Sequence, residues 1–391
     1  MTRFDMLISA AMLACCTLTG GCAHTEKPEA RQLSDPGYVS KRHFTTSAAQ
    51  DTWLFKDTTL DVSLIAPNAS GAFPLVIYLP GLGESTDAAV LWRNAWAQAG
   101  YAVLSIQPHD LGASIWRSPR ARAGNFAALA ADQFSPAARA AHTAVLVDAF
   151  AEVRRRAASG QAPYARVDLQ HVAIAGFDLG AATAVSLATS RMTMPAGWVW
   201  RAAIILSPPA ADGAAVAGTV DAIPFLCITG TADADPFGLT ASPRQREAAC
   251  AALPARDRYA VVLSNANHAL LSGANTYSDD PIYANGAADP SAGGRPSKKP
   301  RSAQLRQNND GNPELSEEPD DGPRQKRRRA PVLTGPGPFD PKLLGAVQAI
   351  STAFLDATLR DDALARAWLA KDAAMWLGDS GVLRSASPAS K

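Results

Sequence analysis

The chain carries almost no net charge. Its 391 residues include 37 Lys and Arg against 36 Asp and Glu, which gives a formal net charge of +1 at pH 7. A chain this close to neutrality has no strong field to attract a polyanion, so we expect no nucleic-acid partner. Hydrophobic residues, in contrast, make up 47% of the sequence. This content supports a large core, and we expect one main domain with appendages.

Histidine is scarce, and its positions do not suit a metal. The histidines other than His268 are scattered without the short spacing that metal ligands show: His24, His43, His109, His142 and His171. We therefore expect neither a metal ion nor another cofactor.

Cysteine is also sparse. Cys15, Cys16 and Cys22 lie in the amino-terminal segment, which leaves Cys227 and Cys250 for the body of the chain. A disulfide between these two is possible in an oxidising compartment. Because Cys227 lies in the middle of a predicted strand and Cys250 on the following helix, we expect two separate buried thiols instead.

The amino terminus has no hydrophobic run long enough to span a membrane, which takes about 20 residues. An uncharged run covers only residues 6–18, and small residues precede Cys22. This pattern predicts a signal peptide over residues 1–21. Small residues before a cysteine also resemble a bacterial lipobox. We therefore expect Cys22 to be lipidated and to anchor an exported protein to a bacterial membrane, facing the periplasm. Ordinary secretion and a retained membrane anchor are the alternatives. Polar residues 22–50 predict a flexible tether.

Apolar strands alternate with helices between residues 51 and 271. Apolar runs predict strands at 73–79, 101–106, 172–175, 200–206, 223–229 and 259–263, after an early half-buried strand at 53–66. Helices are predicted at 88–99 and 137–157, and a long irregular segment, 107–136, precedes the second. This alternation predicts an α/β fold with a mostly parallel sheet covered by helices on both faces.

The strand at 172–175 runs into the turn Gly176-Phe177-Asp178-Leu179-Gly180 and then into a helix of small residues. Gly176 and Gly180 lack a Cβ, so the strand and helix can meet at a sharp turn that lifts the side chain of Asp178 above the sheet edge. This is the pattern of a nucleophile elbow with aspartate at its centre. The alternative is a solvated turn aspartate in an ordinary strand-turn-helix unit.

Other polar residues follow strands in the same way. Asp233 and Asp235 come shortly after the strand at 223–229, and His268 comes after the strand at 259–263. Asp178, Asp233 and His268 therefore stand in the chain order nucleophile, acid, histidine, which is the order of α/β-hydrolases.

These motifs resemble the α/β-hydrolase superfamily, and in particular its dienelactone-hydrolase-like branch, near the chlorophyllases, platelet-activating-factor acetylhydrolases and polyester hydrolases. The resemblance covers about residues 53–271 and resumes near residue 343. It implies an α/β-hydrolase fold without a large cap domain.

The resemblance also implies roles for individual residues. His268 matches the general base, and Asp233 matches the acid that orients it, with Asp235 as the alternative acid. The segment Pro80-Gly81-Leu82 matches the oxyanion loop. The backbone N–H groups of Leu82 and Leu179 are the two expected oxyanion donors.

Asp178 departs from this family pattern, which has serine at the elbow. A carboxylate that attacks an ester forms a mixed anhydride and is itself the better leaving group, so the intermediate collapses backwards. Haloalkane dehalogenases and epoxide hydrolases instead use an elbow aspartate to attack an alkyl carbon, and a histidine-activated water then hydrolyses the alkyl ester. Those enzymes also have a helical cap with Tyr or Trp donors to the leaving group. No cap is visible in this sequence, and Trp116 or Tyr101 is the available donor.

Three functions remain compatible with this pattern. The first is a hydrolase that forms a covalent intermediate on Asp178. The second is a weak esterase in which His268 activates water directly, and the third is a catalytically silent binding protein on a hydrolase scaffold. We expect a small-molecule substrate of apolar character, because Trp92, Trp116 and Phe177 suggest an apolar pocket.

Residues 272–331 interrupt the pattern directly after the histidine loop. They are rich in Gly, Pro, Asn, Asp and Ser and have few large apolar residues, so they predict a disordered insertion. A basic run at 326–329 resembles a nucleic-acid patch, but the export signal favours a solvated linker. Apolar spacing predicts a helix over 343–359, and residues 332–378 supply the closing helices before a tail at 379–391.

Overall fold

The computed structural model describes residues 37–386 except 56, 190–193, 211–222, 255–256 and 275–339. The predicted signal peptide and Cys22 lie outside the described residues, as does all but the start of the predicted insertion. No helix in the described part of the chain is both long and apolar enough to cross a membrane.

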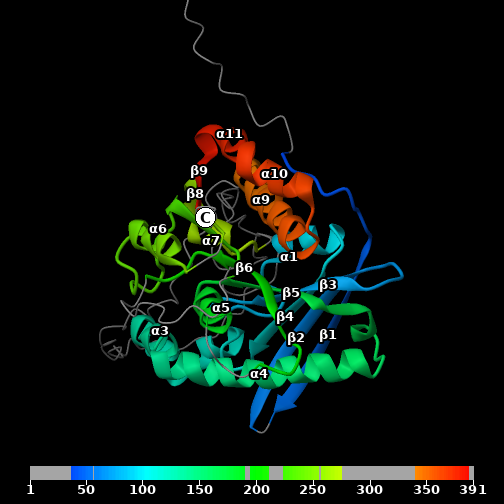
Figure 1. The fold of residues 1–391 in the computed structure, drawn as a ribbon. Coiled ribbons are helices and arrows are strands. Elements are labelled where there is room, and N and C mark those ends of the chain that lie inside the picture. The colour runs from blue at the N-terminus through cyan, green and yellow to red at the C-terminus, as the bar shows by residue number, and fades with distance from the viewer. Residues whose placement is uncertain are drawn as a thin grey trace, which may run out of the picture.

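The described strands form one mixed sheet in the order β1-β2-β4-β3-β5-β6-β7-β8-β9 (Figure 1). The six strands from β4 across to β8 pair in parallel, whereas β1, β2 and β9 join the sheet by antiparallel pairing. The predicted α/β class and mostly parallel sheet are confirmed. The strands are β1 (Thr46–Phe55), β2 (Thr58–Pro67), β3 (Phe73–Leu79), β4 (Ala102–Pro108), β5 (Val167–Phe177), β6 (Trp200–Leu206), β7 (Phe225–Ala232), β8 (Arg258–Asn267) and β9 (Gly381–Ala386).

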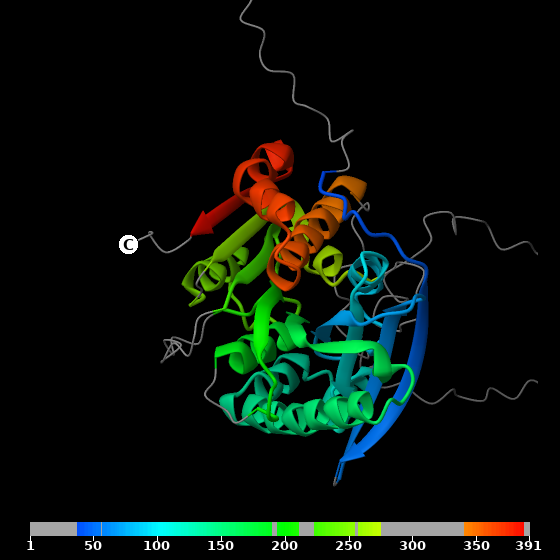
Figure 2. The same cartoon turned by 45° about the vertical axis from the view of Figure 1, so that its right-hand side comes forward.

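Helices cover both faces of this sheet (Figure 2). One face packs against α1 (Val90–Gln98), α9 (Pro341–Leu359) and α10 (Ala363–Lys371), and the other against α4 (Pro136–Ala158), α5 (Leu179–Thr189) and α6 (Pro243–Ala252). Along β3, Val76 and Tyr78 enter the first core and Leu75 and Ile77 the second. Because both faces are buried, the strand is apolar along its whole length.

The predicted closing helices are present. The helix predicted over 343–359 corresponds to α9, and α10 and α11 (Ala373–Leu377) follow it. The predicted tail is wrong for residues 381–386, which form β9 and pair with β8 at the edge of the sheet. Backbone pairing at an edge needs no continuous apolar run, so the sequence pattern missed this strand.

The predicted tether at 22–50 is also wrong at its end, because β1 already begins at Thr46. Most side chains of β1 are exposed, and Trp53 is its one fully buried residue. The strand is therefore held by its pairing with β2, and the single strand predicted at 53–66 is in fact two strands.

The segment predicted to be irregular, 107–136, contains three short helices: η1 (Ala113–Arg117), α2 (Pro119–Arg122) and α3 (Phe126–Gln133). The Ser118 hydroxyl accepts a hydrogen bond from the Ala121 N–H and so caps α2, whose first residue is Pro119. These helices lie between β4 and α4 in the chain and carry part of the apolar cluster that includes Leu82.

Cys227 and Cys250 form a disulfide, so the prediction of two separate thiols is wrong. Cys227 lies on β7 and Cys250 on α6, and their Cα atoms are 5.5 Å apart, a usual distance for a disulfide. Sequence spacing does not reveal that α6 packs directly on the strand that precedes it. The bond ties α6 to β7, next to the loop that holds Asp233.

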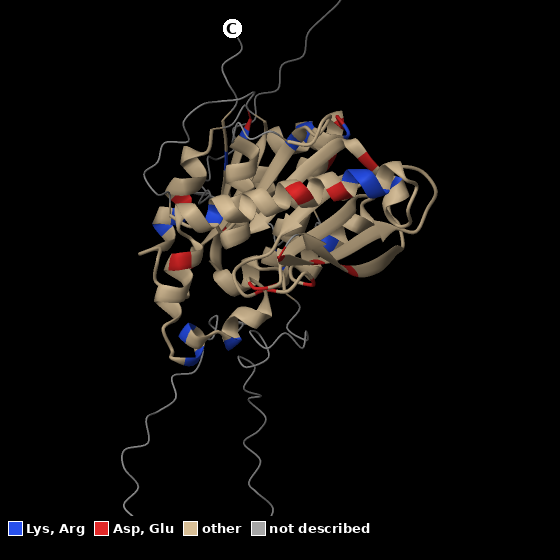
Figure 3. Cartoon of the chain, turned by 90° about the horizontal axis from the view of Figure 1, so that it is seen from below, with Lys and Arg blue, Asp and Glu red and all other residues tan. Residues whose placement is uncertain are grey.

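Acidic and basic residues are scattered over the described ribbon (Figure 3). Neither sign gathers over a large area in this view.

Candidate active site

Asp178 lies at a sharp turn between β5 and α5. Its φ angle is 51°, in the left-handed region that side chains other than glycine rarely adopt. A Cβ at Gly180 would lie 1.9 Å from the Leu79 carbonyl oxygen, and one at Gly176 would lie 2.2 Å from the carbonyl oxygen of Gly180. Both glycines are therefore required by the close approach of strand and helix. The turn has the shape predicted for an elbow with Asp178 at its centre.

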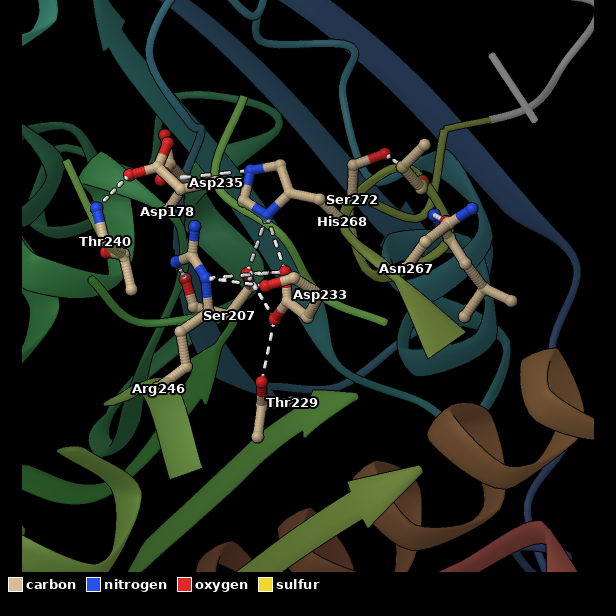
Figure 4. Close-up of polar contacts among 12 residues, drawn as sticks. Asp178, Ser207, Thr229, Asp233, Asp235, Thr240, Arg246, Asn267, His268 and Ser272 are labelled. Carbon is tan, nitrogen blue, oxygen red and sulfur yellow. Dashed lines mark hydrogen bonds and ion pairs between the residues drawn. The ribbon is translucent and has the colours of Figure 1, made fainter. Parts of the chain in front are cut away.

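The structure brings Asp178, Asp233 and His268 together (Figure 4). Asp233 follows β7, and His268 is the first residue of α7 (His268–Leu271). The Nδ1 atom of His268 lies 2.8 Å from Asp233 Oδ1, and its Nε2 atom lies 3.9 Å from Asp178 Oδ1. The imidazole thus lies between two carboxylates. Asp178 and His268 are each 3% exposed, and Asp233 is fully buried.

Asp235, the alternative acid, takes part in a turn. Its Oδ1 accepts a hydrogen bond of 2.8 Å from the Phe237 N–H, and its Oδ2 accepts one of 2.6 Å from the Thr240 N–H. Of the two carboxylates in this loop, Asp233 is the one that bonds His268.

Asp233 is surrounded by donors. Thr229 donates its hydroxyl proton to Asp233 Oδ2 at 2.8 Å, and the Nε atom of Arg246 lies 3.5 Å from Oδ1. Burial opposes ionisation, but the hydrogen bond from His268, the charges of His268 and Arg246 and the hydroxyl of Ser207 outweigh it. Together they hold the pKa of Asp233 below its usual range. Asp233 is therefore an anion at neutral pH.

Asp178 has the opposite balance. Burial raises the pKa of Asp178 above its usual range, and the nearby charge of Asp235 adds to the rise. The positive charges of His268 and Arg246 and the N–H of Leu179 offset only part of this effect. The two carboxylates on either side of His268 thus differ in how readily they ionise.

Arg246 is a site residue that the sequence did not reveal. It is fully buried, and its Nη1 donates to the carbonyl oxygens of Ser207 at 2.8 Å and Pro208 at 2.9 Å. Its Nε donates to the carbonyl oxygen of Asp233 at 3.2 Å. Nothing in the sequence distinguishes this arginine from Arg244 on the same helix, because the distinction depends on which face of α6 meets the sheet. Arg246 and Cys250 are one turn apart, so the disulfide holds that face in place.

Ser207 is the second residue that was missed. It comes directly after β6 and is fully buried, with its hydroxyl near Asp233 and the imidazole of His268. A usable signal existed, since Ser207 follows an apolar strand at the same sheet edge, as Asp178 does.

The predicted oxyanion loop is a tight turn. Gly81 donates its N–H to Glu84 Oε2 at 2.7 Å, Glu84 donates its N–H to the Gly81 carbonyl at 3.2 Å, and Gly83 donates to the Leu111 carbonyl at 2.7 Å. The N–H of Leu82 has no acceptor among the described residues. The loop therefore leaves one backbone donor free at the predicted position.

Leu179, the other predicted donor, is the first residue of α5, where backbone N–H groups lack partners within the helix. The Leu179 N–H lowers the pKa of Asp178 and so offsets part of the effect of burial. This donor therefore lies at the start of α5, next to Asp178.

An apolar cluster lies beside the predicted oxyanion loop. The Trp116 ring stacks on Phe237 at 6.0 Å between centroids, and its Nε1 donates to the Gly83 carbonyl at 3.2 Å. The side chains of Leu82 and Leu179 belong to the same cluster. Trp116 thus links the helices of the 107–136 segment to the turn at Gly83 and to Phe237, in the loop that follows β7.

The other predicted aromatic residues divide between the site and the core. Phe177 contacts the imidazole of His268, with ring centroids 4.6 Å apart. The Nε1–H group of Trp92 donates to the Leu271 carbonyl oxygen at 3.2 Å and so holds the end of α7, the helix that begins with His268. Tyr101 donates its hydroxyl to Asp356 in α9, so it is not placed to serve as a leaving-group donor beside Asp178.

No group of three or more His, Cys, Asp or Glu side chains in the described part of the chain is arranged to hold a metal ion. No known protein-family model matches the chain, and comparison with curated proteins finds no match either. The arrangement of Asp178, His268 and Asp233 is therefore the basis for a functional proposal.

Replacing the two loop aspartates should separate their roles. Asp233→Asn removes the negative partner of buried Arg246 and His268, and we expect it to lower the free energy of unfolding by about 3 to 5 kcal/mol. Asp235→Asn, the matched control, removes one acceptor in a turn and should cost about 1 kcal/mol. Urea denaturation at pH 7 measures both. Because folding lowers the pKa of Asp233, its charge stabilises the folded protein fully when the pH is above the usual pKa of a carboxyl group. This stabilisation is lost as the pH falls through the lowered pKa. Equal losses in the two variants would contradict this assignment.

Asp178→Asn should stabilise the protein at neutral pH. Because folding raises the pKa of Asp178, ionisation of this carboxyl destabilises the folded protein as the pH rises through the normal carboxyl pKa and beyond. The neutral amide of Asn avoids this cost. We therefore expect the variant to gain about 1 kcal/mol in free energy of unfolding at pH 7, or roughly 2 to 4 °C in Tm. Below the usual carboxyl pKa the aspartate is protonated in both states, and the gain should vanish. Thermal unfolding of both proteins from pH 3 to pH 8 checks this. A gain that is the same at every pH would show that the charge of Asp178 is not its source.

Proposed function

We propose that the chain has an α/β-hydrolase fold and is an exported hydrolase with Asp178 as nucleophile, His268 as base and Asp233 as acid. One observation carries the proposal: the His268 imidazole lies between the carboxylates, with Nδ1 2.8 Å from Asp233 and Nε2 3.9 Å from Asp178. Asp178 also occupies the left-handed turn in which a nucleophile is presented at the sheet edge. The export signal and the lipid anchor at Cys22 belong to the proposal as predictions from the sequence.

The chemistry of a carboxylate nucleophile selects the electrophile. In the first step, an Asp178 oxygen attacks an alkyl carbon, a C–O bond forms, and the bond from that carbon to a halide or an epoxide oxygen breaks with its electron pair. A halide leaves as the anion, whereas the alkoxide of an opened epoxide takes a proton from water. An alkyl ester of Asp178 results. Attack on the acyl carbon of an ester would form an anhydride that reverts, so alkyl halides and epoxides are the favoured substrate classes.

Hydrolysis of the alkyl ester needs a base, and His268 is suited to it. Asp233 is an anion that can only accept, so the neutral form of His268 carries its proton on Nδ1 and keeps a lone pair on Nε2, on the side of Asp178. Nε2 removes a proton from water, and the resulting hydroxide attacks the carbonyl carbon of the Asp178 ester. The tetrahedral intermediate then collapses and expels the alkoxide, which takes the proton from Nε2 and leaves as the alcohol, and the carboxyl group of Asp178 releases a proton and is again a carboxylate.

The backbone around Asp178 supports the second step. The Leu82 N–H has no protein acceptor in the described chain, and the Leu179 N–H lies at the start of α5, directly after Asp178. Both donors are therefore available to the oxyanion that forms on Asp178 during hydrolysis.

The surroundings favour an apolar substrate. Leu82, Leu179, Trp116 and Phe237 share one apolar cluster beside the elbow. An alkyl halide or epoxide carries no charge, so it would gain from burial against these side chains without an ionic partner.

Trapping the covalent intermediate tests the proposal. His268→Ala should still be alkylated on Asp178 but should hydrolyse the ester slowly, so an adduct approaching one per chain should accumulate. Intact-protein mass spectrometry after incubation with a panel of haloalkanes, epoxides and esters measures the adduct, and peptide mapping locates it. The matched control is the double variant Asp178→Asn with His268→Ala, which should remain unmodified.

Other results would overturn the proposal in favour of a stated alternative. No adduct, together with ester turnover that survives Asp178→Ala, would indicate water activated directly by His268. No adduct and no turnover of any substrate would favour a silent binding protein.

A further inference from the structure

Ser207 lies at the centre of the polar contacts behind His268 (Figure 4). Its Oγ lies 2.8 Å from Asp233 Oδ1, 2.7 Å from Asp233 Oδ2 and 2.8 Å from His268 Nδ1. The residue is fully buried. One hydroxyl thus contacts both partners of the acid–histidine pair.

Ser207 is not placed to be a nucleophile in place of the missing elbow serine. Its hydroxyl meets Nδ1, the nitrogen that also bonds Asp233, whereas Nε2 is the nitrogen that faces Asp178. A nucleophilic serine would need Nε2 as its base and access to substrate. The hydroxyl instead lies behind the imidazole, where it can only act through His268.

The backbone holds this hydroxyl in an unusual conformation. Ser207 has a φ angle of 49°, in the left-handed region, as Asp178 does at the neighbouring strand end. Its N–H donates to the Ile228 carbonyl at 2.8 Å, and its carbonyl accepts from Arg246 Nη1 at 2.8 Å. A strained residue fixed on both sides and next to a reactive histidine is a candidate for a functional role.

The available protons determine the direction of each bond. An anionic Asp233 has no proton to give, so the Ser207 hydroxyl donates to Asp233 and the Nδ1 proton of His268 is shared between Asp233 and the Ser207 oxygen. Two acceptors on the Nδ1 side fix both the tautomer and the rotation of the ring.

We propose that Ser207 is a positioning residue that holds His268 with Nδ1 protonated and Nε2 directed at the Asp178 ester. The inference rests on the proposed function, because it assigns His268 as the base of ester hydrolysis. Ser207 acts only through His268, so it serves the second chemical step and not the attack by Asp178.

Nuclear magnetic resonance tests the positioning without any need for turnover. In the full chain labelled with ¹⁵N-histidine, the wild-type His268 should show a protonated Nδ1 with a downfield proton signal and an unprotonated Nε2. Ser207→Ala should weaken or broaden that proton signal. Ser207→Gly, which suits the left-handed conformation, removes the same hydroxyl and should give the same change.

Thr229→Val provides the matched control. Thr229 also donates a hydroxyl to Asp233, but no contact to His268 is found for it in the described structure. This variant should keep the Nδ1 proton signal, because both acceptors of that proton remain.

Kinetics tests the assignment to the second step. With a substrate that alkylates Asp178, Ser207→Ala should alkylate at the wild-type rate but hydrolyse the ester about 10- to 100-fold more slowly, as expected for a hydrogen bond to a charged group. Adduct should therefore accumulate in this variant. A merely structural role would slow both steps together.

Three results would overturn the inference. The first is a wild-type His268 with its proton on Nε2, which needs no variant. The second is an unchanged Nδ1 signal in both Ser207 variants, and the third is equal slowing of alkylation and hydrolysis. If no substrate alkylates Asp178, the proposed function fails, whereas the resonance experiment still decides whether Ser207 positions His268.

Discussion

The site depends on one buried carboxylate, that of Asp233. It accepts hydrogen bonds from residues of separate elements, including Ser207 after β6, Thr229 on β7 and His268 on α7, and it faces Arg246 on α6. A buried anion is stable only when such donors surround it. The disulfide between β7 and α6 keeps Arg246 on the correct side, so the charge balance of the site and the packing of α6 support each other.

Burial affects Asp178 differently, because fewer donors compensate for it than at Asp233. Its carboxylate is held in a left-handed turn and in an environment that raises its pKa, which makes the ionised form costly. A poorly solvated carboxylate is also a better nucleophile than one in water, because less hydration must be removed before it attacks. Burial of the Asp178 carboxylate therefore destabilises the fold at neutral pH and also favours the covalent mechanism that we propose.

The parts of the site that the sequence predicted share one physical origin. Asp178, Asp233 and His268 each follow an apolar strand, and the carboxyl ends of parallel strands meet at one edge of a sheet, so their convergence was predictable. Ser207 obeys the same rule. Arg246 and the disulfide were not predictable, because they depend on which face of α6 packs on β7. The edge strand β9 was missed and most of β1 was assigned to the tether, because their backbone pairing needs no continuous apolar run.

The central claim, that Asp178 attacks the substrate, is tested most directly by following oxygen. In a single turnover in H₂¹⁸O with an alkyl halide or epoxide, an Asp178 oxygen becomes the product hydroxyl, and the label from water enters the carboxylate of Asp178. The account predicts an alcohol without ¹⁸O and an Asp178 peptide heavier by one ¹⁸O atom. Labelled alcohol with an unlabelled Asp178 peptide would show that water attacks the substrate directly and would contradict the account.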